Sequence, residues 1–282
     1  MTGAPHERGP EPVAGTLAAD WATLNRANWD DRVPIHVRSQ FYDVDGFVQG
    51  DEHLYPFEVE DLGDLTGKRV VHLQCHIGLD TISLGRHGAE VTGLDFSAPA
   101  LAEAAKLARK CGVSARFVEA NVYDAIAALG GERFDVVYTG RGALNWLPDL
   151  DAWARVVAGL LVPGGRLYLT EFHPILNLFN SDLELKHPYF NEGAEVWDAP
   201  FTYTEGEVPL EHTILVEWPH PLSDVINAIV GAGLRIERLD EHDYCAFAAF
   251  PSMVQLGPRL YRLPEDMPRL PFMFTITATR PS

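Results

Sequence analysis

Residues 68–95 read KRVVHLQCHIGLDTISLGRHGAEVTGLD, and this stretch decides the fold of the chain. Arg69–Leu73 is a short apolar run rich in β-branched residues, which is typical of a strand buried on both faces. Gln74–Gly78 then forms a turn, and apolar residues recur at helical spacing over Leu79–Arg86. A second strand follows at Glu90–Leu94. The order strand, turn, helix, strand predicts the first half of a nucleotide-binding βαβ unit.

The turn after the first strand indicates which nucleotide this unit binds. A dinucleotide site needs G-x-G-x-x-G, because its second glycine lets the backbone approach a pyrophosphate. Here Gln74, His76 and Leu79 hold those positions, and the turn has one glycine, Gly78. The side chains would crowd a pyrophosphate, whereas Asp95, 21 positions after Gln74, is placed to accept hydrogen bonds from ribose hydroxyls. An acid for the ribose without a pyrophosphate cradle suits a nucleoside without phosphates, such as S-adenosylmethionine.

The run VVHLQCHIGLDTISLGRHGAEVTGLDFS resembles the first two motifs of class I (Rossmann-like) S-adenosylmethionine-dependent methyltransferases, with HLQCHIG as a variant of their D-x-G-x-G-x-G loop. Further matches are ARFVEANVYD, FDVVYTG and LVPGGRLYLTEFHP, in the order and spacing of that family. The resemblance covers the chain from about Asn25 to its C-terminus. Two positions depart from it: His72 stands where the family usually has an acid, and Asn121 where an aspartate usually contacts adenine.

The resemblance implies an α/β fold with a doubly wound, seven-stranded, mostly parallel sheet, an antiparallel last strand and helices on both faces. We expect the last strand to insert between the fifth and the sixth. Helices should follow Ser97, begin at Asp149 and occupy Ser223–Ala232, and the remaining strands should lie at Arg116–Val118, Phe134–Tyr138, Arg166–Thr170, Arg235–Leu239 and Phe272–Ala278.

We expect three regions along the chain. Residues 1–15 carry proline, glycine and charge with little to bury, which predicts a disordered tail. Residues 16–67 form a helical and aromatic cap, with a helix from Thr16 to about Trp29. Residues 68–282 form the methyltransferase domain, with an acceptor-side insertion at about 174–221.

Two stretches allow more than one interpretation. The aromatic segment Ser39–Pro56 either covers the edge of the sheet or, with Trp29 and His36, contributes to a lid over cofactor and acceptor. Within the insertion, Phe201–Tyr203 and Thr213–Trp218 could pair as a hairpin.

Charge and cysteine content limit the function classes. The net charge of −18 argues against a nucleic-acid surface, because phosphate binding needs clustered lysine and arginine. The three cysteines are odd in number and lack metal-ligand spacing, which indicates reduced thiols in the cytoplasm. The sequence shows no membrane-spanning run and no signal peptide. We therefore expect a cytoplasmic protein, monomeric or homodimeric, whose partner is a small-molecule methyl acceptor.

The resemblance also implies the site residues. Asp95 should bind the ribose, Asn121 should accept from the adenine amino group, and His76 should contact the methionine end of the cofactor, although it could instead cap the helix. The expected cofactor contacts are Gln74, Cys75, His76, Gly78, Asp95, Phe96, Asn121, Val122, Tyr123, Thr139, Gly140 and Tyr42, with Phe96 and Tyr123 as core residues the alternative.

Acceptor contacts are expected from Arg141, Asn145, Trp146, His36 and Phe41. Arg141 either pairs with the cofactor carboxylate or an acidic acceptor, or forms a surface salt bridge.

His173, with Glu171 beside it, is the candidate base for an acceptor that carries a proton, and a structural histidine is the alternative. The histidines and acids at Glu241–Asp243, His212 and His220 match no metal-ligand spacing, so no metal is expected.

The sequence thus predicts an enzyme that transfers a methyl group from S-adenosyl-L-methionine to oxygen, nitrogen or sulfur of a small molecule and releases S-adenosyl-L-homocysteine. Two alternatives stay open. An NAD(P)-dependent oxidoreductase shares the βαβ unit and the acid, but the missing glycines oppose it. A protein that binds S-adenosylmethionine without catalysis is not excluded by any residue of the sequence.

Overall fold

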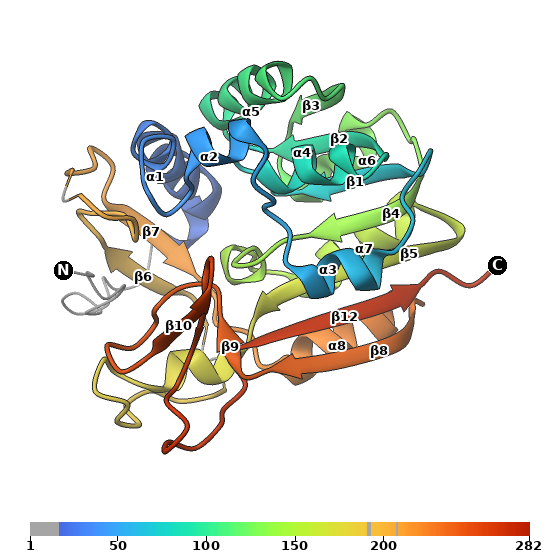
Figure 1. Cartoon of the computed structure of the whole chain (residues 1–282). Coiled ribbons are helices and arrows are strands. Elements are labelled where there is room, and N and C mark those ends of the chain that lie inside the picture. Colours follow the sequence, from blue (N-terminus) through green and yellow to red (C-terminus); the bar gives the residue numbers. More distant parts are fainter. Residues whose placement is uncertain (1–16, 191–192, 207) are drawn as a thin grey trace.

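The central sheet follows from the apolar runs of the sequence. The computed structural model describes residues 17–190, 193–206 and 208–282, and within them seven strands pair in the order β3-β2-β1-β4-β5-β12-β8 (Figure 1). The predicted doubly wound sheet is confirmed. Its strands are β1 (Arg69–Leu73), β2 (Glu90–Asp95), β3 (Ala115–Glu119), β4 (Phe134–Thr139), β5 (Leu161–Phe172), β8 (Arg235–His242) and β12 (Met273–Thr279).

Alternate residues of the strands pack against helices on opposite faces of the sheet. Val71 and Leu73 of β1 lie in a core shared with α7 (Leu150–Leu160) and α8 (Leu222–Gly231). Val70, which points the other way, packs with residues of α3 (Pro56–Leu62) and α4 (Leu79–Arg86). Burying each such side chain contributes about 1.5–3 kcal/mol. The shorter α6 (Ala125–Ala128) joins the first face, and α5 (Ala98–Lys110), capped by Ser97 as expected, covers the second.

The carboxyl ends of the parallel strands meet at one edge of the sheet. β1 pairs in parallel with β2 and with β4, and β4 pairs in parallel with β5. The strand order reverses between β1 and β4, which is where open α/β sheets bind ligands. The loops after these strands carry η2 (Val122–Asp124), η3 (Leu144–Trp146) and η4 (Pro174–Leu178).

The last strand inserts where the resemblance implies. β12 is antiparallel to both neighbours, with Met273 opposite Phe172 of β5 and His242 of β8.

The hairpin in the insertion uses a different first strand from the one we considered. β6 (Glu195–Asp198) pairs with β7 (Ile214–Glu217), and Val196 and Val216 lie opposite each other in a buried cluster. The strand β7 falls within the expected Thr213–Trp218, whereas Phe201–Tyr203 follows Pro200 and forms no strand. The expected pairing of Phe201–Tyr203 was therefore wrong, and this segment instead lines the cavity described below.

The N-terminal segment packs onto this hairpin. The described part begins with η1 (Leu17–Asp20), and α1 (Trp21–His36) continues beyond Trp29, where we expected the helix to end. Asn25 of α1 donates to the carbonyl of Val216 and accepts from its amide, both at 2.8 Å. Thr16 and the tail expected at residues 1–15 lie outside the described residues.

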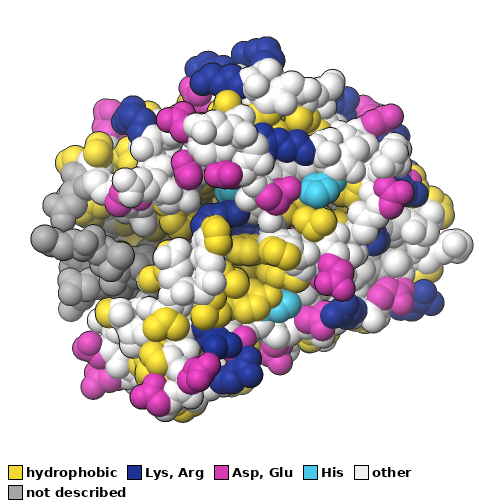
Figure 2. Space-filling model, in the orientation of Figure 1, with side chains coloured by type: hydrophobic (Ala, Val, Ile, Leu, Met, Phe, Trp, Pro, Cys, Tyr) yellow, Lys and Arg dark blue, Asp and Glu magenta, His cyan; other side chains and the backbone are white. Residues whose placement is uncertain are grey.

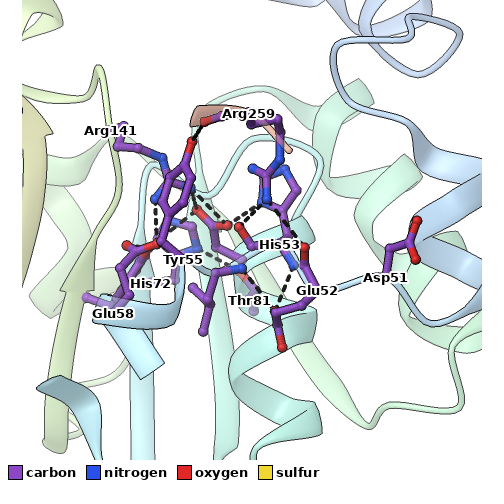
Figure 3. A network of polar contacts seen from close by, with 12 residues as sticks. Asp51, Glu52, His53, Tyr55, Glu58, His72, Thr81, Arg141 and Arg259 are labelled. Atoms are coloured by element: carbon purple, nitrogen blue, oxygen red, sulfur yellow. Dashed lines mark hydrogen bonds and ion pairs between the residues drawn. The ribbon is translucent and has the colours of Figure 1, made fainter. Parts of the chain in front are cut away.

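A second excursion between β8 and β12 has no counterpart in the sequence analysis. Its strands β9 (Tyr244–Cys245), β10 (Val254–Gly257) and β11 (Leu260–Arg262) form a small antiparallel sheet. Arg259, at the turn between β10 and β11, donates to the carbonyl of His53 at 2.6 Å, and the Tyr55 hydroxyl donates to the carbonyl of Arg259 (Figure 3). This clasp joins the excursion to the segment between α2 (Val44–Gln49) and α3.

The surface shown in Figure 2 has acidic and basic side chains interspersed around a central apolar patch. Within the part of the chain that the structure describes, no helix has the length and apolar character needed to cross a bilayer.

Candidate active site

A cavity of about 2370 Å³ lies at the carboxyl edge of the sheet. Its wall comes from the β1–α4 loop, the end of β2, the loop after β4, α1, the segment before α3, and both excursions. A space of this size accommodates a nucleoside and a second small molecule together.

The β1–α4 loop has the left-handed backbone conformation that usually favours glycine, although two of its three left-handed positions are not glycine. Gln74, His76 and Gly78 have φ values of 57°, 48° and 77°, all in the left-handed region. A residue other than glycine there is disfavoured by roughly 1–2 kcal/mol. A side chain at Gly78 would come within 2.8 Å of Ala104, so only that position requires glycine for space. The departures at 74 and 76 therefore change the side chains of the loop and retain its left-handed path.

The side chains of Gln74 and His76 both have hydrogen-bond partners around the cavity. The amide nitrogen of Gln74 donates to the carbonyl of Ala143 at 2.9 Å, which ties the loop after β1 to the loop after β4. The ring of His76 hydrogen-bonds to the ring of His36 at 2.9 Å, and His36 bonds in turn to Thr202 at 2.7 Å. Burial lowers the pKa of His76 to about 3, so both its ring and that of His36 are neutral at physiological pH.

Asp95 lies between the β1–α4 loop and the start of α5. Its side chain is 5% exposed, one oxygen accepts from the amide of His76 at 2.8 Å, and the other accepts from the amide of Ser97 at 2.9 Å. Burial raises the pKa of Asp95 to about 6. A carboxylate has room for about four hydrogen bonds, so these two leave acceptor capacity toward the cavity.

Glu171 shapes the loop after β4. Its carboxylate accepts from the amides of Ala143 at 2.8 Å and Leu144 at 2.9 Å, and also from Gly142 and Phe172. Glu171 lines the cavity, but its oxygens are occupied by backbone donors. Its role in this structure is to hold the loop that faces Gln74.

Arg141 is paired inside the protein. Its guanidinium lies 2.7 Å from Glu58 and 3.2 Å from Asp80, and its side chain is 8% exposed (Figure 3). The alternative of a surface salt bridge is wrong, because Arg141 and both of its partners are buried. The cofactor or acceptor contact considered for Arg141 is not favoured either, since carboxylates from α3 and α4 already use this guanidinium.

A buried polar network surrounds this ion pair. Glu58, fully buried, also accepts from the Tyr138 hydroxyl at 2.8 Å, and Asp80 pairs with the ring of His53. Burial raises the pKa of Glu58 against the opposing effect of Arg141. Although burial opposes its charge, Arg141 and His53 hold the pKa of Asp80 well below its usual range. His72 stands where the family usually has an acid. In this structure Asp80 brings a carboxylate close to that position, because the side chains of Asp80 and His72 both approach Gly140.

Aromatic side chains close the cavity on the side of α1. The rings of Trp29 and Trp146 meet edge to face at 5.3 Å, and Trp29 meets His76 at 5.1 Å. The hydroxyls of Tyr42 and Tyr203 hydrogen-bond to each other. Residues of the aromatic segment therefore do reach the cavity, as the lid interpretation requires.

The structure brings most of the expected site residues to one cavity. Those that line it are Gln74, Cys75, His76, Gly78, Asp95, Phe96, Asn121, Val122, Gly140, Tyr42, Phe41, Arg141, Asn145, Trp146 and Glu171. Four lie behind the wall: His36, Tyr123, Thr139 and His173.

His173 is placed as a structural histidine. One ring nitrogen bonds to Glu241 at 2.9 Å and the other accepts from the amide of Ile175 at 3.1 Å, which caps η4. With both nitrogens used and the ring outside the cavity wall, the geometry does not support His173 as the base.

The adenine side differs in detail from the expectation. The hydroxyl of Tyr123 bonds to the backbone of Asp149 at the start of α7, so this ring supports the fold and does not line the cavity. The Asn121 carbonyl oxygen accepts from the amide of Tyr123 at 3.1 Å, and one of its lone pairs is thus already used. Thr139 is fully buried within β4.

The residues considered for a metal are scattered. His242 bonds to Tyr244 and Thr275, and His220 bonds to the carbonyl of Leu147. Among residues 17–190, 193–206 and 208–282, only Asp31, Glu211 and His212 bring three potential ligands within 4.8 Å of one another, and this group is not part of the cavity wall.

Sequence reasoning missed several residues of the wall. Arg32, His53, Asp80 and Tyr203 line the cavity, and Glu58 lies directly behind it. Asp80 was detectable in principle, because it is polar in the first turn of a buried helix. For the others no local pattern marks them, since long-range packing brings them to the site.

Comparisons with known proteins match the domain at this site. Residues 71–167 match the family described as "Methyltransferase domain". This part of the chain is therefore similar to that family. It contains Gln74, His76, Asp95 and the loop after β4.

Curated proteins similar to this chain include the ubiquinone biosynthesis O-methyltransferase of Cronobacter sakazakii, which is 33% identical over 138 residues. The match covers 48% of this chain and 56% of that protein. The Sodalis glossinidius protein of the same name is 32% identical, over 48% of this chain and 55% of its own length. The chain thus spans about half the length of these curated relatives.

Solved structures share the fold. An S-adenosylmethionine-dependent methyltransferase from Mesorhizobium loti superposes with a TM-score of 0.56 at 20% identity, covering 83% of this chain and all of the other. The 1,6-didemethyltoxoflavin-N1-methyltransferase of Burkholderia thailandensis superposes with a TM-score of 0.57 at 17% identity, covering 99% of this chain and 100% of its own. The resemblance to class I methyltransferases is confirmed for the domain and the fold.

Proposed function

We propose that the protein is an S-adenosylmethionine-dependent methyltransferase that acts on oxygen, nitrogen or sulfur of a small molecule. The observation that carries this proposal is the β1–α4 loop. It has the left-handed backbone of a nucleotide-binding loop, its His76 amide is fixed on Asp95, and it carries side chains where a dinucleotide needs bare backbone.

The residues of the cavity fit the cofactor. Asp95 would accept from the ribose hydroxyls, and Phe96 and Val122 would flank the adenine. The Oε1 of Gln74 is buried and has no hydrogen-bond partner among the described residues, so it is suited to accept from the cofactor's α-ammonium group. When bound, the cofactor supplies an electrophilic methyl group on a cationic sulfur.

The protein's own contribution is positioning and exclusion of water. Glu171 and Gln74 fix the loop after β4, which would face the sulfonium. Methyl transfer is an in-line displacement, so holding the acceptor atom close to the methyl group and collinear with the departing sulfur supplies much of the acceleration. The rings of Trp29, Trp146 and Tyr203 would keep the reacting atoms dry.

The acceptor class follows from the cavity and the relatives. The volume and its aromatic wall suit a small, partly apolar molecule. Two relatives are named as O-methyltransferases, which favours a hydroxyl acceptor. The NAD(P) alternative is disfavoured because Gln74 and His76 stand at positions where a dinucleotide-binding loop has glycine.

Transfer of a labelled methyl group tests the proposal. The protein is incubated with S-adenosylmethionine labelled in the methyl group and a metabolite extract, and the small-molecule fraction is counted. We expect label in that fraction and S-adenosylhomocysteine in equal amount. Binding of S-adenosylhomocysteine without any transfer would favour the non-catalytic alternative, and preferential binding of NADH would favour the oxidoreductase.

A further inference from the structure

Arg32 of α1 is a buried cation in the wall of the cavity. Its side chain is 4% exposed, and its guanidinium carbon lies 5.0 Å from the ring centre of Trp29, 5.7 Å from Trp146 and 5.8 Å from Tyr203. Within the described residues its guanidinium makes no hydrogen bond and no ion pair, and its Nε has no acceptor.

Arg141 has anionic partners of a kind that Arg32 lacks. Arg141 lines the same cavity and has Glu58 and Asp80 within ion-pair distance. Arg32 has Glu217 as an acidic neighbour that acts on it through its field, and the Glu217 carboxylate accepts from Asn145 at 2.9 Å. Burying a guanidinium without an anion is unfavourable, and ring faces compensate for it only in part. The geometry therefore lacks one anionic group beside Arg32.

The elements around Arg32 indicate which molecule brings that anion. Arg32 and Trp29 belong to α1, and Tyr203 belongs to the excursion between β5 and α8. Both elements lie outside residues 71–167, the methyltransferase domain that contains Gln74, His76 and Asp95. Function resides in the groups that an individual protein adds to a shared fold, so we assign the anion to the acceptor.

The rings around Arg32 restrict the shape of the acceptor. Trp29 and Trp146 meet edge to face and both line the cavity, so the wall beside the guanidinium is aromatic, which suits a flat ring. A guanidinium binds a carboxylate through two parallel hydrogen bonds in the same plane.

We propose that Arg32 forms an anionic subsite that binds the carboxylate of a flat, aromatic acid, and that such acids are the acceptors of this enzyme. The proposal rests on the function proposed above and adds the substrate class to it.

Matched pairs of charged and neutral ligands test whether the Arg32 subsite prefers an anion. Protein saturated with S-adenosylhomocysteine is titrated with benzoate and benzamide, and with 3,4-dihydroxybenzoate and its neutral methyl ester, in low-chloride buffer. Binding is followed by calorimetry and by tryptophan fluorescence, because Trp29 and Trp146 flank the guanidinium. We expect each acid to bind at least tenfold tighter than its neutral partner.

Two variants show whether Arg32 carries this preference. Arg32→Met should abolish the tenfold difference while the dissociation constant of S-adenosylhomocysteine changes less than twofold. Arg38→Met removes an exposed arginine just beyond α1 and should change neither value.

The melting temperature of the ligand-free variants separates a binding role from a structural one. Because no described carboxylate lies within ion-pair distance of the guanidinium, Arg32→Met should melt at the wild-type temperature or above it. A marked decrease would mean that the fold depends on Arg32 and would overturn the proposal. Arg32→Lys keeps a charge in place and should retain part of the preference for acids.

Two further results would also overturn it. Equal binding of acids and neutral partners by the wild type would show that no anionic subsite exists. A tenfold loss of S-adenosylhomocysteine affinity in Arg32→Met would assign the guanidinium to the cofactor's carboxylate. If the wild type did not bind S-adenosylhomocysteine at all, the proposed function itself would fail, which these titrations detect first.

Discussion

Removing the guanidinium of Arg141 should destabilise the protein strongly. In Arg141→Met, Glu58 and Asp80 stay buried and lose the cation that lies 2.7 Å and 3.2 Å away. Breaking a buried ion pair from one side is unfavourable by about 3–5 kcal/mol. For a chain of this size, each kcal/mol corresponds to roughly 2 °C, so we expect the melting temperature to fall by about 6–10 °C.

The assay is urea unfolding followed by tryptophan fluorescence. With a slope of about 3 kcal/mol per molar, the midpoint should fall by about 1–1.7 M. Arg235→Met is the control: it removes an arginine whose partner, Glu237, is exposed, and should leave the unfolding curve unchanged.

The loss of stability in Arg141→Met should increase with pH. Without Arg141, the pKa values of Glu58 and Asp80 move upward, because burial is no longer opposed. A carboxyl group whose pKa is raised in the folded state destabilises it as the pH rises through that pKa. The difference between Arg141→Met and the wild type should therefore be larger at pH 8 than at pH 5.5. A loss below 1 kcal/mol at pH 8 would refute the view that this guanidinium stabilises both acids.

Three further outcomes are expected. His173→Ala should keep turnover within about twofold of the wild type, because its ring faces Glu241 and lies outside the cavity wall; a tenfold loss would restore the base hypothesis. The affinity for S-adenosylhomocysteine should rise about fourfold between pH 5.5 and pH 8 as Asp95, with a pKa of about 6, ionises and accepts from the ribose; a fall would contradict that role. Arg259→Ala should speed hydrogen exchange at residues 52–55 but not in β1, since it breaks the clasp on the His53 carbonyl; unchanged exchange would show that the clasp does not hold this segment.

Much of the fold could be predicted from local patterns. The run Arg69–Leu73 is β-branched because a strand between two parallel neighbours is buried on both faces, and the helix at Leu150–Leu160 shows the spacing of a helix packed on a sheet. The resemblance to class I methyltransferases implied the order of the strands and the antiparallel β12.

The excursions were less predictable, for a physical reason. β6 is a four-residue strand whose pairing depends on Asn25 and on a hydrophobic cluster with Trp21, both distant in sequence. The strands β9–β11 are equally short and depend on contacts with Tyr55. Short strands carry too few residues for periodicity to show.

The candidate site likewise has one part that the sequence predicts and another that it does not. Asp95 and the positions in the β1–α4 loop follow from a contiguous motif, and the structure brings them together. Arg141, between two glycines, forms ion pairs with acids from α3 and α4, whereas Arg32, which directly follows Asp30 and Asp31 in the sequence, forms none with the described residues. That difference depends on packing between segments far apart in the chain, which a single sequence does not display.

The central claim is that the β1–α4 loop and Asp95 hold an adenosyl sulfonium and exclude a dinucleotide. Calorimetric titration of the wild type and of Asp95→Asn with S-adenosylhomocysteine and NADH tests it most directly. We expect the wild type to bind S-adenosylhomocysteine at least tenfold tighter than NADH, and Asp95→Asn to lose about tenfold or more, because a hydrogen bond to a charged group contributes about 1.5–3 kcal/mol. Tighter binding of NADH, or undiminished binding by Asp95→Asn, would contradict the claim.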